Sequence, residues 1–372
     1  MLKKRILSFL GAAALTAALT FAVVSLSPSN GFTSGSMQEG MSYEVCGVSP
    51  DAIVASLDGN GASADLITYW IGYNATYLNS YMQHYGGGAL DWDYTMSDGT
   101  TMPDYIKQDV LATVKQELLI ENLANKYGVT LTDEQRAAIE SDEQSFITQY
   151  GSEEAFDEEL AKLGLRRETY ERITATNYLY QNLYKLYLTE GSALYVSDED
   201  LAAYAAAQNY ITADHILLTT VDTATGEALS DETIAKKKAL AEELAEKLKN
   251  YTGDDLASYF AELADEYSED PGRASYPTGY TFTTGSMVQE FEDAAYALDE
   301  GAVSDIVESS FGYHILLRLP LDKAAAAESV REAYFTNFID EQLEKVTLAT
   351  SEQFDALDAQ ALYEAIVAAQ AE

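Results

Sequence analysis

Two histidines with nearly matching neighbours are the residues of this chain best suited to chemistry. His215 lies in the run Asp-His-Ile-Leu-Leu and His314 in the run Tyr-His-Ile-Leu-Leu. One histidine in an apolar run is usually a core residue, but two in equivalent contexts predict a pair. On adjacent strands the imidazoles would fix each other's tautomers and polarise a nearby hydroxyl or acid. A metal site is disfavoured because no clear third ligand accompanies them.

The elements that must position these histidines predict a small α+β domain over residues 210–322. Residues 211–220 form a β-type run around His215, and residues 311–319 form another around His314. Between these runs the patterns predict, in order, helices over 231–249 and 254–267, a Pro- and Gly-rich loop over 268–285, a short helix over 287–298 and a strand over 303–307. The histidines therefore fall on the first and last strands of one domain.

Five blocks of this domain resemble parvulin-type peptidyl-prolyl cis-trans isomerases. In chain order the blocks cover residues 213–217, 260–272, 285–298, 301–305 and 311–316, in the order and at the spacing of that family. Together with the helical segments on either side and an export signal, they make the whole chain similar to PrsA/SurA-type extracytoplasmic foldases.

The resemblance implies a catalytic set and a proline pocket. His215 and His314 match the family's paired histidines, and Asp270 falls where the family has a Cys or Asp facing the substrate carbonyl. No cofactor or metal is expected, because X–Pro isomerisation breaks no covalent bond and requires only that the twisted amide be favoured. The residues matching the wall of the proline pocket are Met287, Phe291 and Phe311.

One loop departs from the family pattern. The usual Gly-Gly-Asp-Leu-Gly run, whose leucine lines the pocket, is replaced by residues 276–282, and Gly279 stands at or near the leucine position. We therefore include Gly279 and Phe282 among the expected substrate-binding residues, with Tyr280 as an alternative to Phe282. Two functions stay open: an exported isomerase and chaperone for secreted proteins, or a catalytically weak or inactive holdase. The acidic loop over 219–235 lacks Lys and Arg, which disfavours phosphorylated substrates.

The start of the chain predicts export. Lys3, Lys4 and Arg5 precede an uncharged apolar run over residues 6–26, which is typical of a signal peptide or an N-terminal membrane anchor over residues 1–28. Residues 29–50 are expected to be a flexible linker, in which Cys46 lies too far along for lipidation. The rest of the chain is expected outside the cytoplasm, secreted or attached at the outer face of the cell membrane.

Helical patterns flank the isomerase-like domain. Residues 51–209 predict a chaperone-like helical domain, in which Pro103 begins a helix and Thr132 with Gln135 makes a capping box. Residues 323–372 predict C-terminal helices that complete its core. The fold class is therefore α+β, with a parvulin-like domain inserted into a helical domain. Unfolded exported polypeptides with X–Pro bonds are the expected partners, and a homodimer would form a cradle for them.

The composition of the chain disfavours several other classes of protein. The 22 Lys+Arg residues against 61 Asp+Glu residues give a net charge of −39, which disfavours nucleic acid as a partner. A single cysteine excludes an internal disulfide framework. The 372 residues predict two or three domains at roughly 150 residues each. An acidic surface protein with a structural role would suit the charge, but it does not explain the isomerase-like blocks.

Overall fold

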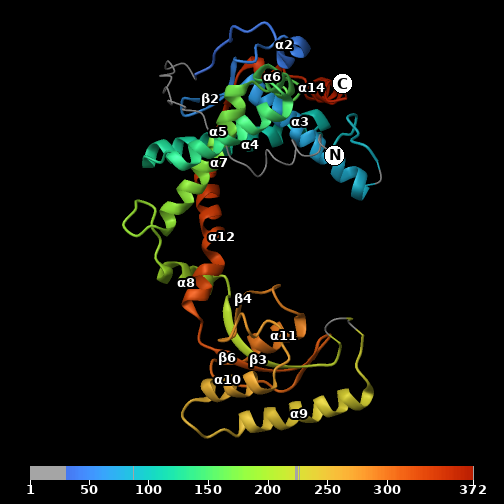
Figure 1. Cartoon of the computed structure of the whole chain (residues 1–372), viewed down its shortest axis with the longest axis vertical. Helices are drawn as coiled ribbons and strands as arrows, with labels where there is room; N and C mark the ends of the chain where they lie inside the picture. The colour runs from blue at the N-terminus through green and yellow to red at the C-terminus, as the bar shows by residue number, and fades with distance from the viewer. Residues whose placement is uncertain (1–30, 87, 223–224, 226, 372) are drawn as a thin grey trace. The chain divides into compact units, whose positions relative to one another are not determined.

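The computed structural model describes residues 31–371 except 87, 223–224 and 226. The chain divides into two compact units (Figure 1). Among the described residues, the helical unit contains those up to Tyr195 together with those from Phe338 onward, and the isomerase unit contains those in Val196–Asn337. The signal peptide or anchor predicted over residues 1–28 lies outside the described residues. Among the described helices, none combines the length and the apolar character needed to cross a bilayer.

The helical unit is built from both ends of the chain. Its small antiparallel sheet has the order β2-β1-β7, so that β7 (Ala349–Thr350) from the C-terminal segment pairs with β1 (Ile53–Leu57). Its other elements are α2 (Met41–Cys46), β2 (Asn60–Ser63), α3 (Ala64–Tyr81), the π-helical turn η1 (Met82–Gly86), α4 (Met102–Tyr127), α5 (Asp133–Tyr150), α6 (Glu153–Ala161), α7 (Arg167–Leu188), α13 (Glu352–Asp355) and α14 (Ala359–Ala369).

Local sequence signals explain where the main helices begin. The Thr101 side chain caps α4, with Pro103 in its first turn. The predicted capping box at α5 is confirmed: Thr132 accepts from the Gln135 backbone, and the Gln135 side chain accepts from the Thr132 backbone N–H at 2.9 Å. Each cap satisfies backbone donors that the first helical turn leaves unpaired.

Two buried ion pairs tie the helices of this unit together. Asp65, only 1% exposed, accepts from Arg166 Nε at 3.0 Å. Glu121 on α4 bonds Arg172 on α7, with Nη2–Oε2 at 2.6 Å and Nε–Oε1 at 2.8 Å. Burial opposes ionisation of Glu121, but Arg172 and further hydrogen bonds hold its pKa below the usual range. The Glu121–Arg172 pair therefore remains charged, and breaking it would leave an uncompensated buried charge.

The range expected to be a flexible linker, residues 29–50, contains ordered structure in its described part. Helix α2 lies within it and packs against α3 and α14. Upstream, the Ser36 backbone N–H and hydroxyl donate to the Asp51 carboxylate at 2.9 and 3.1 Å. Asp51, α3 and α14 all lie outside the Ser- and Gly-rich segment, so its composition alone does not reveal these contacts.

The isomerase unit is a four-stranded antiparallel sheet with helices on both faces. The strand order is β4-β3-β6-β5, with β3 (Ile211–Thr219) and β6 (Gly312–Leu319) at the centre. The remaining elements are β4 (Tyr280–Phe282), β5 (Val307–Ser309), α8 (Asp198–Ala207), α9 (Asp231–Lys249), α10 (Leu256–Tyr267), α11 (Gln289–Ala297) and most of α12 (Lys323–Glu344).

Side-chain alternation divides this sheet between two cores. One face carries Ile216, Leu218, Ile315 and Leu317, which pack with α9 and α10. The other face carries Ala213 and Leu316, which pack against residues of α11. Because successive residues of a strand point to opposite faces, His215 and His314 both fall on the α11 face.

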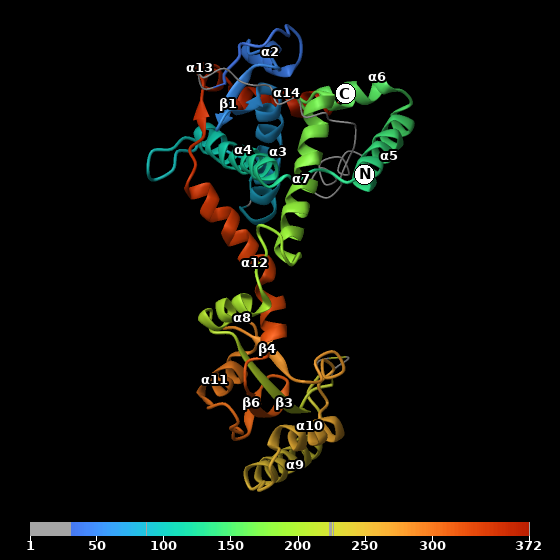
Figure 2. The same ribbon diagram turned by 90° about the vertical axis from the view of Figure 1, so that its left-hand side faces the viewer.

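The isomerase unit extends beyond residues 210–322, the range expected for the parvulin-like domain. Helix α8 packs against the start of α12 (Figures 1 and 2) through the buried residues Leu201, Ala205, Ala326, Ala327 and Val330. This pair of helices is joined to the sheet by the Asp322 backbone N–H, which donates to Thr212 Oγ1 at 2.8 Å. The difference arises because tertiary packing, and not helical pattern, assigns these segments to a unit.

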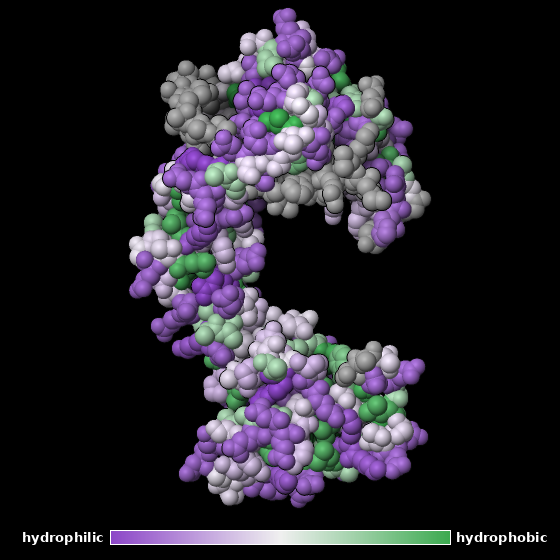
Figure 3. Space-filling view, in the orientation of Figure 1, coloured by the Kyte–Doolittle hydropathy of each residue, from purple (hydrophilic) through white to green (hydrophobic). Residues whose placement is uncertain are grey.

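The surface agrees with the acidic composition. On the face shown in Figure 3, hydrophilic residues dominate and hydrophobic residues form scattered patches. This distribution is expected of a chain with a net charge of −39, because like charges spread over a surface keep a protein soluble.

Candidate active site

The two histidines are diagonal neighbours on the central strand pair. His215 on β3 lies opposite Leu316, and His314 on β6 lies opposite Leu217. Their ring centroids are 5.4 Å apart. Diagonal positions on one face of an antiparallel pair are within reach of large side chains. The histidine pair predicted by matching sequence contexts is therefore present as a contact across the sheet.

Phe291 of α11 covers both imidazoles. Its ring lies nearly perpendicular to each, with centroid distances of 5.2 Å to His215 and 5.6 Å to His314. Phe291 is itself 3% exposed and contacts Phe282 at 5.7 Å. Edge-to-face packing of this kind fixes ring orientation. Helix α11, which carries Phe291, therefore helps to hold the two imidazole rings in their orientations.

The Nε2 atom of His314 has a hydrogen-bond partner that sequence reasoning missed. Ser309 Oγ on β5 lies 2.7 Å from His314 Nε2, and it also accepts from the Phe311 backbone N–H at 3.1 Å. The sequence feature that could have indicated this contact is the tight β5–β6 hairpin, which pairs Ser309 with Gly312. Within the described residues, the buried Nδ1 atoms of His215 and His314 have no hydrogen-bond partner.

Asp270 is held beside His215 by the loop that follows α10. Its Oδ2 lies 3.8 Å from His215 Nε2 and accepts from the Tyr280 hydroxyl at 2.6 Å. Its Oδ1 accepts from the Gly272 backbone N–H at 3.1 Å. The loop is attached to β3, since the Glu269 backbone N–H donates to the Leu217 carbonyl at 2.8 Å. Sequence position alone places Asp270 in this loop; the fold brings it to the histidines.

Burial keeps both imidazoles neutral near neutral pH. It lowers the pKa of His215, although Asp270 and Asp214 act in the opposite direction. For His314, burial and the neighbouring His215 lower the pKa to about 4. A neutral imidazole offers one donor and one acceptor, so the pair can respond to a polar substrate group without carrying charge.

The basic residues closest to this loop are paired with carboxylates. Arg273 Nη1 donates to both Asp214 oxygens, at 2.7 and 2.8 Å, and its Nε donates to Asp265 at 2.9 Å. Lys237 bonds Glu269. These pairings commit Arg273 and Lys237 to carboxylates, in line with the acidic loop of the sequence.

Of the other predicted pocket residues, Met287 lies in the cluster of Phe291 and Phe311 lies at the β5–β6 turn. Met287 is half-buried in the same cluster. Its loop is held by the buried Glu292, which accepts from the Met287 backbone N–H at 2.8 Å and from that of Gly285 at 3.0 Å. Phe311 is 51% exposed at the β5–β6 turn.

The two residues expected from the altered loop have other roles. Phe282 is 3% exposed and packs beneath Phe291, so it supports the site without facing solvent. Gly279 has φ +92, and a Cβ built on it would lie 2.8 Å from the Ala213 carbonyl oxygen. The leucine usual in the family would not fit on this backbone. Tyr280, which the sequence left as an alternative, lies instead beside His215 at 5.6 Å.

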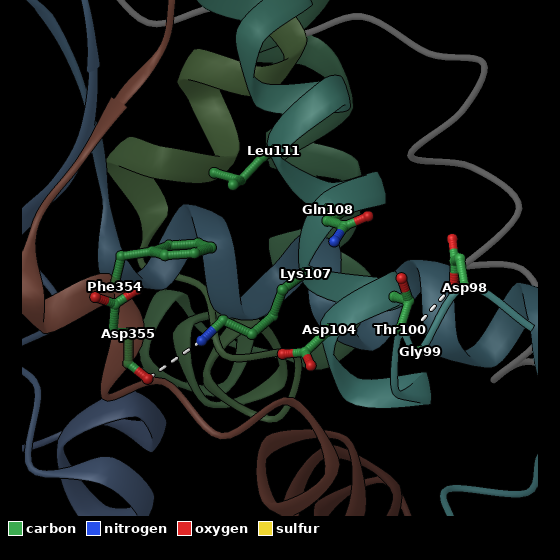
Figure 4. A pocket seen from close by; sticks show the side chains of 9 residues that line it. All are labelled: Asp98, Gly99, Thr100, Asp104, Lys107, Gln108, Leu111, Phe354 and Asp355. Carbon is green, nitrogen blue, oxygen red and sulfur yellow. Dashed lines mark hydrogen bonds between the residues drawn. The ribbon is translucent and has the colours of Figure 1, made fainter. Parts of the chain in front are cut away.

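A separate pocket lies in the helical unit (Figure 4). Lys107 spans it, with Nζ 4.7 Å from the Phe354 ring centroid and donating to the Asp355 carbonyl at 3.2 Å. The volume of this pocket is about 410 Å³, and its lining residues are Asp98, Gly99, Thr100, Asp104, Lys107, Gln108, Leu111, Phe354 and Asp355.

The part of the chain that the structure describes contains no cluster of three metal-ligating side chains.

Comparisons with known proteins identify the kind of domain that contains these residues. Residues 215–319 match the family model "Rotamase: PPIC-type PPIASE domain". The chain is 27% identical over 255 residues to "Foldase protein PrsA" of Staphylococcus aureus, covering 68% of this chain and 71% of the relative. It is 48% identical over 84 residues to "Foldase protein PrsA 4" of Bacillus cereus, covering 22% and 28%.

A solved structure of PrsA from Bacillus subtilis is 23% identical and covers 75% of this chain and 91% of its own, with a TM-score of 0.25. The resemblance stated from the sequence blocks is thus confirmed by the family model and by the sequence relatives. Residues 215–319 form a PPIC-type, parvulin peptidyl-prolyl isomerase domain, in a chain homologous to PrsA foldases.

Proposed function

We propose that this isomerase works through His215, His314 and Asp270, and that Met287, Phe291 and Phe311 hold the substrate proline. The observation that supports the proposal is the grouping of two buried neutral imidazoles, one carboxylate and the Phe291 ring on one face of the sheet. Sequence position gives these residues in four separate segments, and the fold brings His215, His314, Asp270 and Phe291 together.

The chemistry suits these residue types. The barrier to X–Pro rotation, about 18–20 kcal/mol, comes from lost amide resonance. The isomerase must bind the twisted amide more tightly than either planar form. Phe291 and Met287 supply apolar contact for the proline ring, and Asp270 with the imidazoles supplies polar groups around the carbonyl. No nucleophile or cofactor enters the reaction.

We also propose where the chain acts and on which clients. The basic and apolar start of the sequence supports export, with residues 1–28 as a signal peptide or as an anchor at the outer face of the cell membrane. Its clients are then unfolded exported polypeptides, held by the helical unit and isomerised at X–Pro bonds. A homodimer through the helical unit would enlarge the client-binding surface.

Isomerisation of short Xaa-Pro peptides, followed by NMR exchange, tests the catalytic assignment. The full chain is compared with His215→Ala and Phe291→Ala across a panel of residues before proline. Tyr259→Ala is the matched control, because Tyr259 packs with the core on the opposite face of the sheet. Acceleration that is lost in the first two variants and kept in the control supports the site.

The holdase alternative makes a different prediction. If the folded wild-type chain accelerates no peptide of the panel but still suppresses aggregation of an unfolded client, the isomerase assignment of the site fails and client binding is its function. If isomerisation is catalysed, His215→Ala is expected to abolish it and to leave aggregation suppression unchanged.

A further inference from the structure

We propose that Tyr280 is a positioning residue for Asp270, and that this phenol replaces the loop leucine of the family as the side chain beside His215. The inference rests on the proposed function and adds to it a residue that neither the family match nor the relatives assign. It starts from a hydrogen bond: the Tyr280 hydroxyl donates to Asp270 Oδ2 at 2.6 Å.

The same carboxylate oxygen faces the histidine pair. Asp270 Oδ2 lies 3.8 Å from His215 Nε2, and the Tyr280 ring lies 5.6 Å from the His215 ring. The β3–β4 register sets Tyr280 opposite Ala213, on the face that also carries His215. One phenol therefore contacts the carboxylate through its hydroxyl and the imidazole through its ring.

Two glycines allow this arrangement. Gly279, in the left-handed region at φ +92, lies so close to β3 that a Cβ would meet the Ala213 carbonyl oxygen at 2.8 Å. Gly272 lies on the other side, where a Cβ would fall 1.9 Å from the Tyr280 hydroxyl oxygen. Gly279 therefore permits the close approach of β4 to β3, and Gly272 leaves space for the Tyr280 hydroxyl.

The hydroxyl is suited to orient a carboxylate. Asp270 has a 13% exposed side chain, and its Oδ1 is already bound by the Gly272 backbone N–H. Without Tyr280 its Oδ2 would have no fixed donor, and the carboxylate would rotate away from His215. Burial and the bond to Asp270 raise the pKa of Tyr280, so the hydroxyl remains a donor. Tyr276, 4.6 Å away, covers the outer face of the ring.

The test is Tyr280→Phe in the full chain, which removes the hydroxyl and keeps the ring. We expect kcat for Xaa-Pro peptides to fall about tenfold, equivalent to about 1.4 kcal/mol, with KM changed less than twofold. The matched control is Tyr276→Phe, which removes a hydroxyl from the half-exposed neighbouring ring and is expected to keep kcat. Equal losses in the two variants would overturn the proposal.

A double-mutant cycle asks whether Tyr280 acts through Asp270. In an Asp270→Ala background, Tyr280→Phe is expected to cause no further loss of kcat. Additive losses would overturn the positioning role.

A second readout does not require activity. In ¹⁵N NMR spectra of the imidazoles, Tyr280→Phe is expected to shift the His215 signals and to leave those of His84, in the helical unit, unchanged. Unmoved His215 signals would overturn the proposal. A wild-type chain without isomerase activity would overturn the proposed catalytic site alone, because these signals still report whether Tyr280 orients the groups around His215.

Discussion

Ser309 and His314 form a hydrogen-bonded pair across the β5–β6 hairpin, with Oγ 2.7 Å from Nε2. The bond fixes the orientation of one imidazole of the site from the strand at the edge of the sheet. Because His314 is 4% exposed, loss of this partner leaves a buried polar atom unsatisfied, which costs about 1–3 kcal/mol.

Ser309→Ala is therefore expected to lower the free energy of unfolding by about 1–3 kcal/mol and to reduce kcat, both measurable in the full chain. Ser310→Ala is the control, since Ser310 is the exposed residue next in the same turn. A Ser309→Ala variant with unchanged stability and kcat would show that the bond does not orient His314.

The pH dependence of stability follows from His314. Its pKa falls from 6.5 to about 4 in the folded chain because burial and His215 disfavour its charged form. The unfolded chain therefore binds a proton first, so this contribution to stability is fully present above pH 6.5 and is lost as the pH falls to about 4. The loss amounts to about 3 kcal/mol.

Urea unfolding at pH 7 and at pH 4.5 measures this contribution, with His314→Gln as the reference. The wild-type chain is expected to lose more stability than the variant between the two pH values, because glutamine does not titrate. Parallel losses would mean that the His314 pKa is not lowered by folding.

The altered loop predicts a difference between two glycines. Gly279→Ala and Gly285→Ala both place a side chain at positive φ, +92 and +86, at a cost of about 1 kcal/mol. Only at Gly279 does the new Cβ also meet the backbone of β3, whereas nothing lies within 4 Å of the Cβ at Gly285. Thermal unfolding is expected to show Gly279→Ala as the less stable variant by more than 1 kcal/mol. Equal melting temperatures would contradict the close approach.

In the helical unit, Arg172→Met is expected to destabilise strongly, by about 3–5 kcal/mol, because it leaves Glu121 buried and uncompensated. Lys236→Met is the surface comparison, since the pair of Lys236 with Glu232 has side chains 74% and 80% exposed. That variant is expected to change stability by less than about 0.5 kcal/mol. Denaturant unfolding of both chains checks the contrast.

The histidine pair could be predicted because both residues lie in matching β-type runs, and Asp270 because the block around it carries the resemblance. Ser309 and Tyr280 could not. Their roles depend on a hairpin register and on how closely β4 approaches β3, and neither has a periodic signal. Phe282 was expected at the substrate wall, but it shares a core with Phe291. The strand that carries Phe282 has only three residues, which is too short for an alternating pattern to show which side chains are buried.

The limits of the two units show the same difference. Helical periodicity identified the segments that became α8 and α12, but small apolar residues such as Ala205 and Ala326 decide which unit buries them. The helix within residues 29–50 was missed because its contacts are made with α14, far along the chain. Local patterns specify elements, and long-range contacts specify their partners.

The pairing of Ala55 with Thr350 has a consequence for biosynthesis. A chain that emerges from a ribosome or a translocation channel N-terminus first presents β1 long before β7 exists. The helical unit therefore cannot complete its sheet until the segment that carries β7 has emerged, whereas every strand of the isomerase unit is by then available. Contacts so distant in sequence form slowly, and domains generally fold as units during synthesis. The inserted isomerase unit is thus expected to fold first, and the sheet of the helical unit is expected to form only once β7 is available.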